Sequence, residues 1–173
     1  MKKTISLILS AVLCLGLLAA CGAPAAEPTP TPEPQLTGAE LAAHYADAIT
    51  AGRNEQDNAD RPIVTDAEEL GSIGWEVLGL TADQLDAFAV SISFINVQAY
   101  CVGLFKPVEG QAEAVTTALQ TYLDGTEQSF SSYLPDQHEI AQNAILKTLD
   151  DGTIMVVMCD GQDTVAEGIE AAL

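Results

Sequence analysis

The sequence predicts an α+β fold, a two-layer sandwich in which an antiparallel four-stranded sheet carries helices mainly on one face. Two observations lead to this fold class. Within residues 86–173, four short runs alternate between large apolar and small or polar side chains with a period of two, which is typical of strands. Helical spacing follows each pair of runs, which predicts two consecutive ββα units. A domain of this length can bury one sizeable core.

Capping motifs and apolar periodicity place the elements along the chain. Thr37 and Glu40 form a capping box before the first helix. The polar segment 53–62 is expected to be neither helix nor strand, and it does not fit a calcium loop because Pro62 occupies the position that needs glycine. The expected elements are helices at 38–51 and 66–71, a helical turn at 82–86, strands at 87–94 and 98–106, a helix at 109–133, a helical turn at 139–143, strands at 144–149 and 153–159, and a helix at 163–172.

Local residues explain where the strands end. The second strand carries apolar side chains on both of its faces, so we expect its middle to be buried on both sides, and Pro107 ends it because proline cannot extend the ladder. The turn Asp150-Asp151-Gly152 joins the last two strands, where glycine supplies the positive φ of a tight turn.

The first residues have the pattern of a bacterial secretory signal that ends in a lipobox. Lys2 and Lys3 precede an apolar run, and the motif Leu-x-x-Cys ends at Cys21, which follows the small residue Ala20. A transmembrane anchor is the alternative, but the apolar run is shorter than the roughly 20 residues that span a bilayer. We therefore expect a signal peptide at 1–20, cleavage between Ala20 and Cys21, and lipidation of Cys21 by a diacyl, palmitate-type anchor.

Two further segments follow the signal. Residues 21–36 hold prolines at alternating positions, which predicts a polyproline II linker that spans roughly 45 Å, and residues 37–173 form the single globular domain. This arrangement predicts a protein that is attached to the cell membrane on its extracytoplasmic face.

The charge of the chain limits its partners. Cleavage leaves four basic against 25 acidic side chains, a net charge of −21. Such a surface repels nucleic acid and anionic lipid headgroups, so the lipid itself is expected to supply the membrane contact. Two acyl chains are enough for stable anchoring.

Two cysteines remain in the domain after processing. Cys101 and Cys159 both lie in apolar strands, where free cysteine behaves as a small buried hydrophobe. An even pair outside the cytoplasm also permits a disulfide. Both alternatives stay open on the sequence.

The sequence shows no pattern that predicts an enzyme, a metal site or a cofactor. His138 precedes Glu139, but Gln142 stands where a zinc peptidase needs a second histidine, and His44 has no partner at ligand spacing. No Gly-x-Ser-x-Gly elbow occurs. We therefore expect no catalytic residues, no metal and no cofactor.

Three segments resemble a family of bacterial lipoproteins that carry a single α+β domain of unknown function after a signal, a lipobox and a low-complexity spacer. They are Ala99–Lys106 (AYCVGLFK), Phe130–Gln137 (FSSYLPDQ) and Gly152–Met158 (GTIMVVM), within a similar region from about residue 60 to 173. The resemblance implies no activity and no catalytic residues. The family mostly has aliphatic residues at the positions of Cys101 and Cys159, so a disulfide would be a local feature.

Two non-enzymatic functions follow as hypotheses. In the first, the domain is a binding module for an unknown protein, peptide or cell-wall partner, with a candidate patch at Lys106, Tyr133 and Gln137. The alternative for these patch residues is that Tyr133 only fills the core and Lys106 is a solvated strand end. In the second hypothesis, the lipoprotein is an accessory or structural subunit of the envelope. A hydrolytic enzyme is the third alternative. A contiguous exposed apolar patch would favour the first.

Overall fold

The computed structural model describes residues 36–173. The signal peptide, the cleavage site, the lipidation of Cys21 and nearly all of the linker lie outside these residues and stay predictions. Among the described helices, none is long and apolar enough to cross a bilayer. The elements are α1 (Gly38–Gly52), α2 (Glu55–Asp60), α3 (Ala67–Leu78), η1 (Ala82–Gln84), β1 (Leu85–Ile92), β2 (Cys101–Pro107), α4 (Ala112–Phe130), α5 (Pro135–Gln142), β3 (Ile145–Thr148), β4 (Ile154–Met158) and α6 (Gln162–Ala172).

The four strands form one antiparallel sheet in the order β1-β2-β4-β3. Each sequential pair is a hairpin, and the two hairpins join where β2 pairs with β4, with Cys101 opposite Met158. Helix α4 follows the first hairpin and α6 follows the second. The predicted α+β class, with four antiparallel strands in two ββα units, is confirmed.

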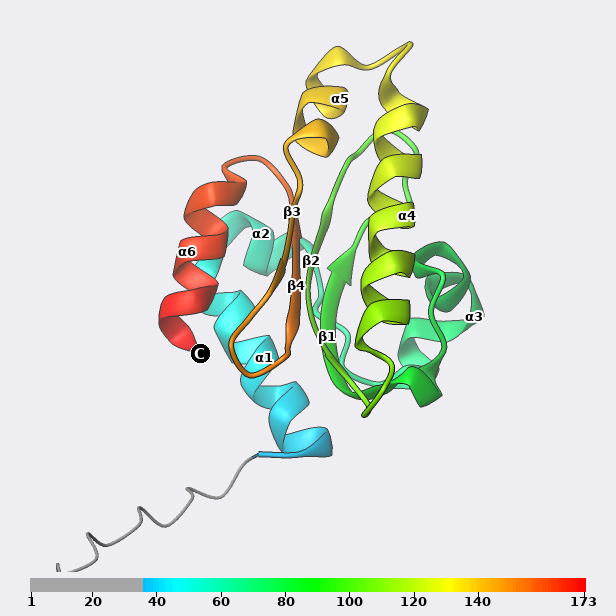
Figure 1. Ribbon diagram of the computed structural model, residues 1–173. Coiled ribbons are helices and arrows are strands. Elements are labelled where there is room, and N and C mark those ends of the chain that lie inside the picture. The colour runs from blue at the N-terminus through cyan, green and yellow to red at the C-terminus, as the bar shows by residue number, and fades with distance from the viewer. Residues whose placement is uncertain (1–35) are drawn as a thin grey trace, which may run out of the picture. The chain divides into compact units, whose positions relative to one another are not determined.

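The layering differs from the prediction, because helices cover both faces of the sheet (Figure 1). One core cluster joins α3, α4 and α5 to the face that carries Phe88, Cys101 and Val156. The other joins α1 and α6 to the face that carries Val102 and Val157. The physical reason lies in the central strands: every residue of β4 is buried, as are the first five of β2, so both faces need cover.

Glycine allows α1 and α6 to cross closely. A Cβ atom built on Gly168 would lie 2.8 Å from the Cα of Gly52, a distance that real side chains do not adopt. Ile49 and Ile169 are fully buried beside this crossing. The absence of two side chains therefore lets the helices pack backbone to backbone.

Several local expectations need correction. The segment predicted to be irregular contains helix α2, which buries none of its residues and is stabilised locally: Asn54 accepts a hydrogen bond from the Asp57 amide (2.8 Å), and Asp57 pairs with Arg61 (2.9 Å). The Thr37 side chain makes no capping hydrogen bond. Helix α3 extends beyond the predicted end, with a kink at Gly71 where φ is +66°.

Candidate functional site

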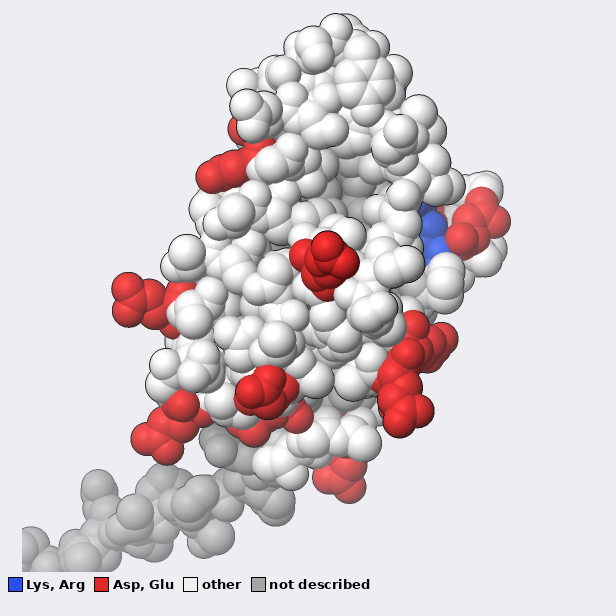
Figure 2. Space-filling view, turned by 90° about the vertical axis from the view of Figure 1, so that its right-hand side faces the viewer, with Lys and Arg blue, Asp and Glu red and all other residues white. Residues whose placement is uncertain are grey.

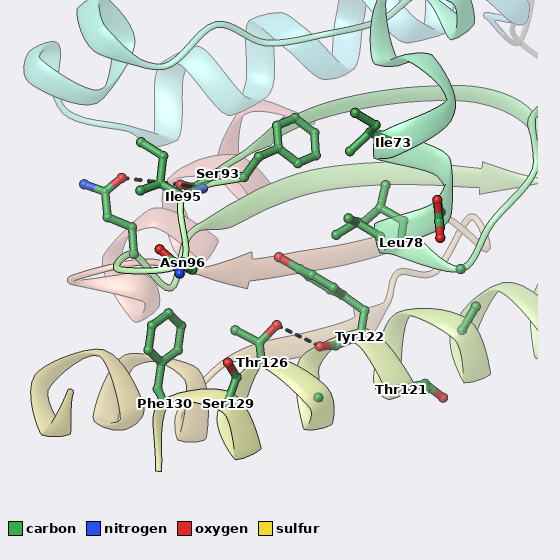
Figure 3. Close-up of a pocket in the computed structure, with 17 residues that line it drawn as sticks. Ile73, Leu78, Ser93, Ile95, Asn96, Thr121, Tyr122, Thr126, Ser129 and Phe130 are labelled. Atoms are coloured by element: carbon green, nitrogen blue, oxygen red, sulfur yellow. Dashed lines mark hydrogen bonds between the residues drawn. The ribbon is translucent and has the colours of Figure 1, made fainter. Parts of the chain in front are cut away.

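A surface groove lies between α3, α4 and the loop that joins β1 to β2. Its volume is about 750 Å³. Ile73 and Leu78 approach it from α3, whereas Tyr122 and Thr126 face them from α4 (Figure 3). The loop closes one end with Ile95. Three segments that are separate in the sequence thus build one apolar groove.

Exposed apolar side chains concentrate at this groove. Six of the eight large hydrophobic residues that are exposed in the described chain lie in or beside it: four line it, Val97 belongs to the loop that closes its end, and Tyr133 bonds to that loop. Ile73 is 66% exposed and Phe94 is 55% exposed. The face that carries α3 and α4 is hollowed and mostly uncharged, with separate acidic side chains on it and at its edges (Figure 2). The six residues are Ile73, Val77, Phe94, Ile95, Val97 and Tyr133.

Tyr122 forms part of the groove floor. Burial raises the pKa of its hydroxyl well above the ordinary value, and the neighbouring thiol of Cys101 adds to this shift. Burial likewise raises the pKa of the Cys101 thiol to about 12. Both groups therefore stay protonated at neutral pH, and the floor of the groove is uncharged.

Hydrogen bonds hold the β1–β2 loop in place as the end wall. The Tyr133 hydroxyl donates to the carbonyl oxygen of Asn96 (2.6 Å), and the Gln137 side-chain oxygen accepts from the Ala99 amide (2.9 Å). The Tyr133 ring packs against Phe130 with a centroid distance of 5.7 Å. Two residues of the predicted patch, Tyr133 and Gln137, are thus brought together next to the groove.

Lys106 does not join them. It lies near the other end of β2, where its ammonium group binds Asp151 in the β3–β4 turn (3.2 Å to Oδ2). Asp151 also accepts from the Thr153 hydroxyl (2.6 Å), and Thr153 contacts the Tyr45 hydroxyl at 2.6 Å. Since the single Thr153 proton goes to Asp151, Tyr45 donates to Thr153. Lys106 therefore belongs to a hydrogen-bonded chain that fixes the turn against α1.

The pKa of Asp151 reflects this chain. Burial acts to raise it, but hydrogen bonds from the Thr153 hydroxyl and amide and from Lys106 outweigh burial, so the pKa lies below its ordinary value. The carboxylate is consequently ionised at neutral pH and locks the turn.

The two domain cysteines are free thiols. Cys101 contributes to the core on the α4 side of the sheet, whereas Cys159 contributes to the core on the α1 side. A disulfide between them is excluded because the sheet separates the two side chains. Cys159 borders a polar cavity with Asp160, yet burial, followed by Asp57 and Asp160, raises its pKa to about 12, which opposes thiolate chemistry.

A further cavity contains a histidine, the side chain most often used in catalytic and metal sites. His44 borders a cavity beside Asp151 and Glu170, but among the described residues it forms no ion pair or hydrogen bond with either. Within residues 36–173, no group of three or more His, Cys, Asp or Glu side chains has the geometry to hold a metal ion.

The groove residues were not predicted from the sequence. Phe94 was expected in a strand, whereas β1 ends at Ile92. Trp75 was expected in a turn, although α3 continues through it and presents Ile73 and Val77 to solvent. A sequence signal was present in the apolar residues Phe94, Ile95 and Val97, which lie close together in the connection between two strands.

Fold and groove together define a small α+β domain with a largely apolar surface groove, whose one charged lining residue is Glu76. The sequence model of a family described as a domain of unknown function, DUF4358, matches residues 75–158 of this domain. The match runs from the second half of α3 to the end of β4, and it includes every groove-lining residue except Ile73. No curated protein and no solved structure gives a significant match.

Proposed function

We propose that this protein is a lipid-anchored binding module of the extracytoplasmic membrane face, and that the groove between α3 and α4 is its binding site. The observation that carries the proposal is the concentration of exposed apolar side chains at a single groove. Exposed apolar surface that is contiguous is costly in water and is typical of interaction sites. The lipobox at Cys21 supports the membrane location.

The chemistry of the groove supports a non-catalytic role. Its lining contains one ionisable carboxylate, Glu76, and neither histidine nor cysteine. The Tyr122 hydroxyl stays protonated because burial raises its pKa. A general acid or base needs a pKa near the working pH, and no lining residue supplies one with a supporting partner.

An accessory or structural envelope subunit is the competing role. A domain that acts only by occupancy needs no exposed apolar groove, because a uniformly charged surface keeps it soluble. The groove therefore favours ligand capture over simple occupancy.

The anchoring half of the proposal is tested by Cys21→Ala. We expect this variant to keep the folded domain but to lose the lipid and accumulate outside the mature membrane-bound form, as measured by fractionation and intact mass. Cys14→Ala is the matched control, because Cys14 lies in the signal but outside the lipobox. An unmodified thiol at Cys21 in the wild-type product would contradict the proposal.

The binding half is tested by purifying the lipidated protein from its own envelope and identifying bound material by mass. Ile73→Ser combined with Phe94→Ser should abolish the association. Leu36→Ser, which changes another exposed apolar residue that does not line the groove, should retain it. Equal recovery of the same partner with all three proteins would refute the groove as the binding site.

A further inference from the structure

We propose that the groove takes an apolar protein segment that carries lysine or arginine beside its apolar side chains. This inference rests on the proposed function, since it names the chemistry of the partner for the same groove. Three properties of the described residues support it: the charge of the lining, the engagement of every basic side chain, and the polar groups along the walls.

The groove has a negative bias. Glu76 is the one charged residue of its lining, and no described lysine or arginine lines it. The wider domain adds to this bias, because residues 36–173 hold 23 of the 25 acidic residues but four of the six basic ones. A partner cation next to the groove therefore meets an attractive field, whereas a carboxylate is repelled.

The four basic side chains of the described domain are already engaged. Arg53 is buried and donates to Asn58 and to the Tyr100 hydroxyl. Arg61 pairs with Asp57 and stacks on the Tyr100 ring at 3.9 Å. Lys106 pairs with Asp151, and Lys147 with Glu170 (2.7 Å). None of them lines the groove, so a basic partner segment meets no competing cation of the described domain there.

The walls also carry hydrogen-bonding groups between the apolar side chains. Some of these groups already bond within the domain, as Thr121 does to Thr117 and Thr126 to Tyr122, but their remaining donors and acceptors can bond to a peptide backbone, whereas an acyl chain offers no hydrogen-bonding atom. A second copy of the domain would bring two strongly acidic surfaces together, which costs free energy. The polar lining residues are Ser93, Asn96, Gln98, Thr121, Thr126 and Ser129.

Three short labelled peptides test the inference against the full chain in a neutral detergent, with fluorescence anisotropy as the readout and protein-free micelles as the blank. The first is Leu-Lys-Leu-Leu-Lys-Leu. The second replaces both lysines by glutamate, and the third replaces every leucine by serine. We expect the first peptide to bind at least about tenfold more tightly than either of the others, because it alone combines apolar and basic groups.

Variants of the chain locate the binding. Ile73→Ser combined with Phe94→Ser should weaken the Leu/Lys peptide at least about tenfold, whereas Leu36→Ser should not change its affinity. Glu76→Gln leaves the apolar walls intact and should narrow the preference for lysine over glutamate. Thermal unfolding of each variant checks that the domain remains folded.

The outcomes separate this inference from the proposed function. If the Leu/Lys and Leu/Glu peptides bind equally and both need Ile73 and Phe94, the groove is a binding site but the basic partner is wrong. If the Ser/Lys peptide binds as tightly as the Leu/Lys peptide, and the groove variant does not weaken it, the binding is non-specific electrostatic attraction to the acidic surface. That result would overturn the inference. Self-association that the groove variant abolishes would assign the groove to a second copy and also overturn it, as would no binding of the Leu/Lys peptide.

Discussion

The close contact between α1 and α6 predicts that adding a side chain at Gly168 lowers the stability of the domain. Replacing Gly168 by alanine places a Cβ atom 2.8 Å from the Cα of Gly52, whereas carbon atoms in contact prefer about 3.5–4.0 Å. The obstructing atom belongs to the backbone, so no side-chain rotation relieves the clash. The two helices must separate by about 0.7–1.2 Å.

Two opposing effects set the magnitude for Gly168→Ala. Overpacking a buried contact lowers the free energy of unfolding by about 1–3 kcal/mol, and the higher helix propensity of alanine offsets about 1 kcal/mol of this loss. We expect a net loss of about 1 kcal/mol in the free energy of unfolding. Gly125→Ala is the matched control, because a Cβ atom there has no heavy atom within 4 Å; it should gain about 0.5–1 kcal/mol.

Urea unfolding at equilibrium measures both variants. Trp75 is the single tryptophan and packs edge-on against Phe88 at a centroid distance of 5.1 Å, so its fluorescence reports loss of the core. Circular dichroism gives a second probe of the same transition. If Gly168→Ala stabilises the protein as much as Gly125→Ala does, then α1 and α6 do not pack backbone to backbone at Gly168, and the prediction is wrong.

Three other perturbations test the buried polar chain and the thiols. Tyr45→Phe should lower the free energy of unfolding by about 1–2 kcal/mol, because it removes a buried hydrogen bond to Thr153. Tyr133→Phe removes an exposed hydrogen bond and should lower it by less than about 0.5 kcal/mol in the same urea assay. Equal losses would contradict this prediction. Asp151→Asn should lower the free energy of unfolding at pH 7, because the folded state lowers the pKa of Asp151 and its ionised carboxylate stabilises the fold. The difference from wild type should shrink as the pH falls below 3.8, the ordinary pKa of aspartate, since protonation removes this contribution. A difference that stays constant down to acid pH would refute this prediction. A thiol reagent at neutral pH should leave both domain cysteines unmodified in the native processed chain and modify both after unfolding, whereas rapid native reaction of either would contradict their burial and raised pKa.

The candidate site was predicted in part. Tyr133 and Gln137 lie next to the groove that we propose as the binding site, because the same loop accepts a hydrogen bond from one and donates to the other. Lys106 was grouped with them only because all three belong to segments that resemble a family. Lys106 lies at the end of β2 away from the β1–β2 loop, whereas Tyr133 and Gln137 reach that loop through long-range contacts that no local pattern specifies.

The sequence by itself determined the secondary-structure class. Alternation with a period of two predicted the four strands, and helical spacing predicted α4 and α6 after their hairpins. Apolar residues on both faces of β2 indicated that this strand is buried on both sides. These features are local, since each depends on residues a few positions apart.

Tertiary structure alone decided the rest. The pairing of β2 with β4 places Cys101 and Cys159 on opposite faces of the sheet, and the placement of α3 beside α4 creates the groove. Both depend on contacts between residues far apart in the chain, whose geometry is set by the packing of whole elements. In the sequence, the apolar residues of the groove could not be told from core residues. Hydrophobicity indicates which side chains prefer burial, but only the packed structure shows which of them remain exposed.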